Sequence, residues 1–304
     1  MAQAILDSAS LTHTPTRSPL RSPKGPAEVA AMEASERPVT WTISEGKQGK
    51  IFRIERMLPE HFEQCIEMSA DAFLTRNAAV MHLQVPAERW HESATEKHRT
   101  CRDSGLSLVA IDDATGDIAA FLFINQFALF KDHKPTEPGL GQFYECGEKM
   151  YEQAIDAGKL SLSSLVRGKT MHVVMGGTSK EYEGTGSGMC LRAYVEKHAA
   201  LHGFDSSLVE PAHPATRHIW EKKLGYTVCA MAPLADLTDK AGAMPFAGLS
   251  RSEQLAICEK AISRSGFWYS AWAMPLIVPA ALLRRRPVFF YRYPVLTEAP
   301  EAKS

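Results

Sequence analysis

The sequence has no excess of charge of either sign, and it lacks the cysteine spacing of a metal site or a disulfide framework. Its 304 residues include 34 Lys and Arg against 35 Asp and Glu, which leaves a net charge of −1. Without a basic excess there is no overall electrostatic basis for binding nucleic acid. The six cysteines include no Cys-x-x-Cys pair, so we predict no zinc site and no disulfide scaffold. Reduced thiols are typical of an intracellular compartment, and we expect the cytoplasm.

The first 40 residues lack both aromatic residues and the apolar core of a secretory signal. Their stretch "SLTHTPTRSPLRSPKGP" is rich in Ser, Thr, Pro and Arg. Such a composition buries too little apolar surface to offset the entropy of ordering, so residues 1–45 are predicted to be a disordered tail. The basic residues also resemble an organelle transit peptide, although Asp7 and the prolines disfavour the amphipathic helix of such a signal.

The rest of the chain has the composition of a folded domain, with 45% apolar and 23% charged residues overall. A hairpin is predicted over residues 106–127, where two apolar runs flank the turn sequence "DDATGD". Hydrophobic periodicity predicts helices over 59–74, 85–105, 148–160, 188–203 and 214–225, and strands over 51–57, 169–177, 204–212, 226–234 and 253–262. This order predicts an α/β fold with a mixed (α+β) sheet over residues 46–262.

The stretch "TSKEYEGTGSGM" at residues 178–189 lies between a predicted strand and a predicted helix. Its alternating glycines, Gly184, Gly186 and Gly188, would let backbone N–H groups approach an anion at a helix N-terminus. A dinucleotide-binding fold would place such a loop in its first strand–helix unit, and a P-loop would carry Gly-Lys-Ser/Thr. Neither applies here. The spacing alone is therefore compatible with two interpretations: a phosphate-binding loop, or a glycine turn without a ligand.

Two motifs together resemble the GNAT superfamily of acyl-CoA-dependent N-acetyltransferases. The first is the loop, in which Glu181, Tyr182 and the three glycines match Glu-Tyr-Arg-Gly-x-Gly-x-Gly. The second is "KKLGY", at residues 222–226, which matches the Lys-Leu-Gly-Phe/Tyr that ends a short helix. The hairpin is similar to the second and third strands of the family, and residues 243–262 are loosely similar to the C-terminal end of its arylalkylamine-type members.

The resemblance implies a GNAT-like fold and direct acetyl transfer from acetyl-CoA, as acyl donor, to a primary amine, with no metal. It implies a small-molecule amine as acceptor. It also implies that the pantetheine arm pairs with the strand end at Gly177 and Thr178. The CoA diphosphate would lie on the backbone of Glu183, Gly184, Thr185, Gly186, Ser187 and Gly188.

Two departures from the family pattern concern charge and catalysis. The family has Arg or Gln where Glu183 stands, and a carboxylate about 5 Å from a phosphate would oppose binding by roughly 3 kcal/mol before screening. The acidic stretch of arylalkylamine-type members is absent from "FLTRNAAV", and Glu221 stands where the family's acidic tyrosine is expected. His172 is a candidate general base, with Glu210 and His213 beside it, although each also fits a purely structural role.

The C-terminal extension, residues 263–304, contains 19 uncharged residues from 265 to 283, followed by three arginines. That length meets the rule for a membrane span, but two prolines weaken it. There are two alternatives: an interfacial helix that contacts a membrane through residues 265–286, or a segment that packs on the domain. The alternative functions are a catalytically silent GNAT-fold module that binds acyl-CoA or a partner, and a membrane-associated protein N-acetyltransferase.

Overall fold

A computed structural model describes residues 41–44, 49–127, 140–161, 165 and 168–263. All of them belong to one unit, which ends at Ser263. The apolar run predicted at 265–283 and most of the predicted N-terminal tail lie outside the described residues. Within the described part, no helix combines the length and apolarity needed to cross a bilayer.

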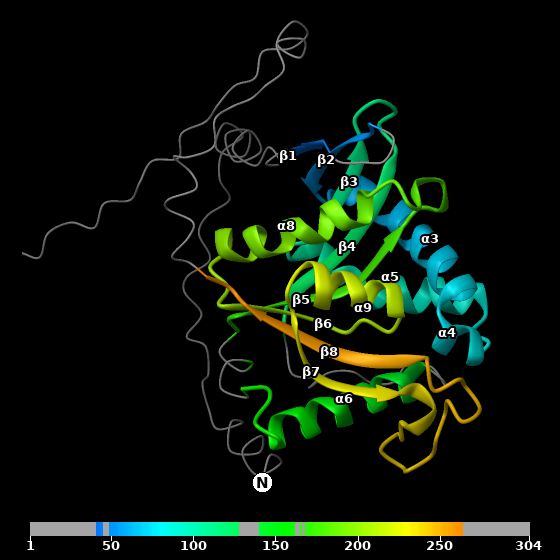
Figure 1. Ribbon diagram of the computed structural model, residues 1–304. Helices are drawn as coiled ribbons and strands as arrows, with labels where there is room; N and C mark the ends of the chain where they lie inside the picture. The colour runs from blue at the N-terminus through cyan, green and yellow to red at the C-terminus, as the bar shows by residue number, and fades with distance from the viewer. Residues whose placement is uncertain (1–40, 45–48, 128–139, 162–164, 166–167, 264–304) are drawn as a thin grey trace, which may run out of the picture. The chain divides into compact units, whose positions relative to one another are not determined.

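The order of elements begins with two strands, three helices and a hairpin, and then alternates helices with strands (Figure 1). The strands are β1 (Trp41–Ser44), β2 (Ile51–Arg56), β3 (Leu108–Asp112), β4 (Ile118–Gln126), β5 (Thr170–Thr178), β6 (Ser206–Val209), β7 (Thr227–Pro233) and β8 (Gln254–Ala261). The helices are α3 (Pro59–Arg76), α4 (Ala78–His82), α5 (Ala87–Asp103), α6 (Leu140–Asp156), α8 (Ser187–Leu201) and α9 (Pro214–His218). Two 3-10 turns, Lys180–Tyr182 and Leu234–Asp236, and a π-helical turn, Ile219–Lys223, complete the described elements.

The described strands form one mixed sheet in the order β1-β2-β3-β4-β5-β6-β8-β7. Neighbours are antiparallel except β5 and β6, which run parallel at the middle of the sheet. A parallel pair needs a crossover connection, and α8 supplies it between β5 and β6. The last strand, β8, inserts between β6 and β7, so the chain does not simply add strands at one edge.

Helices cover both faces of the sheet, and the side chains of β4 show how the core divides. Ala120, Leu122 and Ile124 pack in the cluster that contains α8, whereas Phe121 and Phe123 pack in the cluster that contains α3 and α5. This alternation is the two-residue period of a strand buried on both faces. A third cluster joins α6 to β7 and β8.

The structure confirms the predicted mixed α/β fold and adds elements that the sequence patterns did not reveal. Residues 41–44, assigned above to the disordered tail, form β1, which pairs with β2 from Trp41↔Ile54 to Ser44↔Ile51. Four residues are too short for alternation to identify a strand, so the prediction began at Ile51. The short helix α4 also escaped prediction, and Asn77 caps it through its side-chain oxygen, which accepts a hydrogen bond from the Val80 N–H.

All six cysteines are buried and carry free thiols. Among the described residues, no group of three His, Cys, Asp or Glu side chains is arranged to hold a metal ion.

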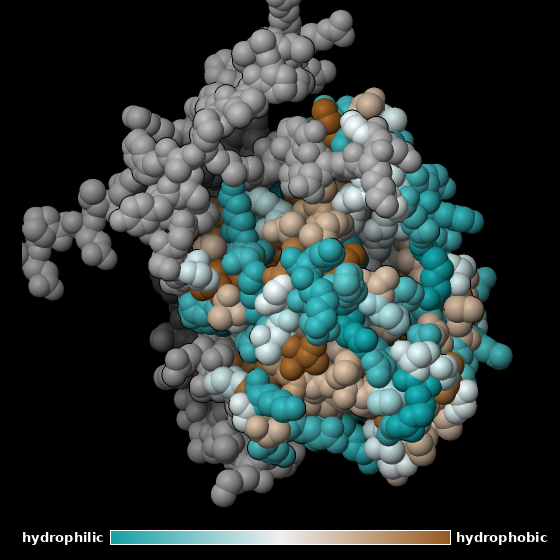
Figure 2. All heavy atoms as spheres, in the orientation of Figure 1, coloured by the Kyte–Doolittle hydropathy of each residue, from teal (hydrophilic) through white to brown (hydrophobic). Residues whose placement is uncertain are grey.

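On the face shown in Figure 2, hydrophobic residues are interspersed with hydrophilic ones. The most exposed large hydrophobic side chains lie on separate elements, and such single residues do not mark a docking surface. They are Met81, Leu201, Met231 and Met244.

Candidate functional site

The central feature of the site is the point at which the parallel strands β5 and β6 part. They pair from Thr170↔Ser206 to Val173↔Val209 and no further. On its other edge β5 remains paired with β4 as far as Thr178. The register with β4 shifts at Val174, which is an extra residue in β5 and forms a bulge. Residues 174–178 therefore have one strand edge free of any described strand, and an extended ligand with amide groups could pair there.

The glycine loop follows this free edge and leads into α8, as predicted. Gly184 and Gly186 have φ of +74° and +93°, values that glycine adopts without steric cost. Gly186 is the N-cap of α8, so the next residues form the first turn of a helix. Among the described residues, no acceptor is found for the backbone N–H groups of Gly184, Gly186 and Gly188. These donors lie at the positive end of the helix dipole and suit an anion.

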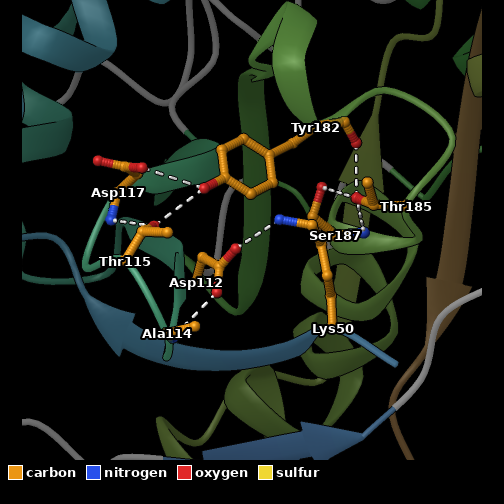
Figure 3. A network of polar contacts seen from close by, with 8 residues as sticks. All are labelled: Lys50, Asp112, Ala114, Thr115, Asp117, Tyr182, Thr185 and Ser187. Carbon is orange, nitrogen blue, oxygen red and sulfur yellow. Dashed lines mark hydrogen bonds and ion pairs between the residues drawn. The ribbon is translucent and has the colours of Figure 1, made fainter. Parts of the chain in front are cut away.

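Tyr182 anchors the glycine loop to the turn between β3 and β4 (Figure 3). Its ring is buried beside Phe52 of β2, with centroids 6.2 Å apart. Its hydroxyl lies 3.0 Å from Thr115 Oγ1 and donates to Asp117 Oδ2 at 3.2 Å, both in the β3–β4 turn. Its carbonyl accepts a hydrogen bond of 2.6 Å from Thr185 Oγ1, inside the loop. Tyr182 is thus fixed through both its hydroxyl group and its carbonyl oxygen, and this positions the backbone amides that follow it in the loop.

Glu183, the residue that departs from the family pattern, does not stand alone. Its carboxylate forms an ion pair with the guanidinium of Arg76, at the C-terminal end of α3, and Arg76 also contacts Asp71 at 3.0 Å. Half of the Glu183 side chain remains exposed to solvent. The repulsion expected between Glu183 and a bound phosphate is therefore reduced by a neighbouring positive charge and by water.

His172, Glu210 and Tyr151 form a polar chain where the strands part. His172 lies on β5, and its Nε2 is 2.9 Å and 2.8 Å from the two carboxylate oxygens of Glu210, the residue directly after β6. The Tyr151 hydroxyl of α6 donates a hydrogen bond to Glu210 Oε1. Burial raises the pKa of Tyr151 well above its usual value, and the charge of Glu210 acts in the same direction. Tyr151 therefore stays protonated and serves as a donor.

These contacts determine which nitrogen of His172 can act as a base. If Glu210 is ionised, neutral His172 must carry its proton on Nε2 and donate it to the carboxylate. Nδ1 then holds the lone pair, and among the described residues it has no hydrogen-bonding partner. The edge of the Phe127 ring packs against the imidazole at 5.3 Å between centroids, which limits its rotation. The arrangement is a histidine oriented by a carboxylate, with one basic nitrogen left for chemistry.

The structure brings two of the three predicted catalytic residues together. His213 is exposed and caps α9, with its Nδ1 accepting a hydrogen bond from the Ala215 N–H at 3.2 Å. Its catalytic role stays a prediction to which this contact adds nothing. Tyr151 was not recognised from the sequence, because its helical position is typical of a packed aromatic residue and only the fold brings it to Glu210.

The "KKLGY" motif begins in the π-helical turn that follows α9 and ends directly before β7. Gly225 has φ of +73° and ends the π-helical turn, and the Tyr226 hydroxyl lies 2.5 Å from Ser207 Oγ of β6. Trp220 is fully buried, whereas Glu221 is partly exposed beside Lys222. Tyr194 packs against His198 on α8.

No protein-family model and no curated protein sequence matches the chain. Solved structures do. The C-terminal condensation domain of Ebony, in complex with β-alanyl-dopamine, matches with a TM-score of 0.61 at 14% identity, over 69% of this chain and 99% of that one. A putative arylalkylamine N-acetyltransferase 7 of the mosquito Aedes aegypti matches with a TM-score of 0.60 at 12% identity, over 74% and 96%. Arylalkylamine N-acetyltransferase 2 of the same species matches with a TM-score of 0.53 at 16% identity, over 70% and 99%.

This chain has a GNAT-like fold. The resemblance inferred from the two short motifs is therefore confirmed at the level of the fold. At identities of 12% to 16% the likeness carries no residue roles across, so the activity has to be argued from this chain's own site.

Proposed function

We propose that the protein is an acetyl-CoA-dependent N-acetyltransferase that acts on a primary amine of a small molecule. The observation that supports this most strongly is the continuity of three features along one path. The free edge of β5 at 174–178 leads to the unpaired loop amides, and the His172–Glu210 pair lies at the point where that edge begins. In acetyl-CoA the reacting thioester is followed by an amide-containing arm and then by the diphosphate, which matches the order of the His172–Glu210 pair, the free β5 edge and the loop amides.

In the proposed reaction, the loop amides and the β5 edge hold the donor, and His172 acts on the acceptor. A protonated amine loses its extra proton, and its nitrogen then attacks the thioester carbonyl carbon. Nδ1 of His172 accepts a proton from the amine, and Glu210 stabilises the imidazolium that results. A C–N bond forms, the C–S bond breaks, and the thiolate of CoA takes up the second proton, which the attacking nitrogen loses as it becomes an amide. No covalent intermediate with the protein is required.

Calorimetry and a thiol-release assay test this proposal in two steps. Titration with CoA should give saturable heat, and the absence of binding at millimolar CoA would overturn the proposal. Release of free thiol from acetyl-CoA is then measured over a panel of alkyl, arylalkyl and polyamine acceptors, with a tertiary amine as the unreactive control. Binding without acetylation of any primary amine would instead favour a silent module that binds acyl-CoA.

A further inference from the structure

Arg192 on α8 is a buried positive charge without a described counter-charge. The residue is only 8% exposed, and no carboxylate among the described residues lies within ion-pairing distance. Its Nη1 donates to the Gly188 carbonyl oxygen at 2.8 Å, but Nε is buried with no hydrogen-bonding partner. Burial lowers the pKa of Arg192 to about 10, which still leaves the guanidinium charged at neutral pH.

The guanidinium lies at the first turn of α8, next to the end of β5. A Cβ atom placed on Gly188 would be 2.7 Å from Arg192 Nη1 and 2.6 Å from Thr178 Oγ1. Gly188 therefore makes room for both side chains. Arg192 thus adjoins Thr178, where the free edge of β5 ends, and Gly188, one of the three residues whose amide donors have no described acceptor.

A lone buried charge is costly, because removal from water is offset only when an opposite charge or a full set of hydrogen bonds replaces the water. One carbonyl oxygen uses one of the five N–H donors of the guanidinium. Nη1 lies beside Gly188, whose amide is one of the loop donors without a described acceptor, so an anion at this turn would complement both groups. Arg is also the side chain best shaped to bind phosphate through paired hydrogen bonds.

We propose that Arg192 is the fixed cation of the donor site and makes that site selective for thioesters that carry a diphosphate. This inference rests on the proposed function and adds to it a residue that sets donor specificity. CoA carries a diphosphate, 4′-phosphopantetheine carries one phosphate, and pantetheine carries none. The three compounds share the same thiol arm, so they separate the contribution of the charge from that of the arm.

The alternative is that Arg192 only shields the Gly188 carbonyl and fills space under α8. The two roles predict opposite effects on the ligand-free protein. A cation retained for binding is unfavourable when no anion is present, so replacement by an apolar side chain of similar length should leave the free protein equally or more stable. A purely structural arginine should instead lose stability on replacement, and the affinity for all three thiols should fall together.

The test uses the full chain with Arg192→Met, Arg192→Lys and, as a matched loss of one charge, Arg89→Met on the opposite face of the sheet. Arg89 is exposed and pairs with Glu92. Thermal midpoints are measured without ligand, and dissociation constants are measured by calorimetry for CoA and 4′-phosphopantetheine and by competition for pantetheine. We expect Arg192→Met to weaken CoA binding about 10- to 100-fold, 4′-phosphopantetheine less, and pantetheine less than about twofold. Arg192→Lys should fall between, and Arg89→Met should match the parent.

An equal loss for CoA and pantetheine, or no loss for either, would overturn the inference while leaving the proposed function intact. If the parent protein does not bind CoA at all, the proposed function fails. In that case inorganic pyrophosphate at millimolar concentration still decides about Arg192, because it should raise the thermal midpoint of the parent more than that of Arg192→Met. If Arg192→Met does not fold, the ratio of CoA to pantetheine affinity in Arg192→Lys carries the test, and an unchanged ratio counts against the inference.

Discussion

The carboxylate of Glu183 is paired with the guanidinium of Arg76, and this ion pair joins the glycine loop to the end of α3. Both residues lie where the sequence departs from the pattern of the family it resembles: Glu183 is an acid in the loop, and Arg76 is a base at the end of the first long helix. Each of these two charges would be unfavourable if its side chain had no partner. The guanidinium of Arg76, which also contacts Asp71, offsets part of the Glu183 charge, so the loop presents its backbone donors beside a paired carboxylate instead of an unpaired one.

Arg76→Met should weaken CoA binding about two- to fivefold, because it leaves the Glu183 carboxylate uncompensated near the bound diphosphate. The effect is modest because both side chains are at least one third exposed and solvent screens their charges. Glu183→Gln should leave affinity unchanged or improve it by a similar factor. Calorimetry at 20 and 300 mM salt measures both, and the differences should shrink at the higher salt.

The double variant Arg76→Met/Glu183→Gln provides the control for this pair. If the two charges act on the ligand only through each other, the double variant should bind CoA about as well as the parent. A double variant as weak as Arg76→Met would mean that Arg76 contacts the ligand directly, which contradicts the interpretation that Arg76 acts by compensating the charge of Glu183.

His172→Ala should lower kcat/KM for acetylation by about 100-fold or more, because a positioned general base typically contributes 10²- to 10⁴-fold. Glu210→Gln should cost less, since the amide can still contact the imidazole but does not stabilise its charge. The two should be non-additive, because one orients the other. CoA affinity serves as the control, and it should be unchanged in both variants. Full activity in His172→Ala would exclude His172 as the base.

Tyr151→Phe removes the hydroxyl that donates to Glu210 while keeping the buried ring. We expect kcat to fall about tenfold with the KM for acetyl-CoA unchanged, because a hydrogen bond to a charged group contributes roughly 1.5–3 kcal/mol and its loss frees the carboxylate to turn from His172. Tyr194→Phe is the matched control, since it removes a hydroxyl from a buried tyrosine on the other face of the sheet. Equal losses in both variants would indicate a general effect of buried hydroxyl removal instead of positioning.

The sequence predicted most of the fold because its long elements carry strong periodic signals. The α3, α5 and α8 helices and the β3–β4 hairpin were all expected at nearly their observed places. What could not be read was the order of strands in space. That β8 lies between β6 and β7, and that β1 extends the opposite edge, depends on tertiary packing instead of local pattern.

The candidate site was predictable only where its chemistry is local. The glycine loop is one continuous stretch, so its role as a set of backbone donors follows from the residues themselves. The Tyr151–Glu210 contact spans 59 positions and the Arg76–Glu183 pair joins two separate elements, so no spacing rule could reveal either. Arg192 is intermediate between the local glycine loop and these long-range contacts. It lies at the position of a buried helix residue, and only its lack of a counter-charge among the described residues shows that it is unusual.

Acidification should destabilise the protein through His198, which is buried on α8 with its Nε2 2.9 Å from the Leu106 carbonyl oxygen. Burial, and then the neighbouring His202, lower the pKa of His198 to about 4 from an ordinary value of 6.5. Between those values the unfolded chain binds a proton that the folded chain does not, so stability falls as the pH falls. The loss should reach about 3 kcal/mol at pH 4.

His198→Gln tests this assignment, because glutamine can donate to the same carbonyl but does not titrate. Urea unfolding is measured for both proteins at several values between pH 7.5 and pH 4.5. The carboxylates contribute nearly equally to both curves, so the difference between the two free energies of unfolding reports His198 together with its coupling to His202. That difference should shift in favour of His198→Gln as the pH falls below about 6.5, since only the parent pays for keeping a neutral imidazole buried. A difference that stays constant across the range would show that His198 is not a source of acid instability.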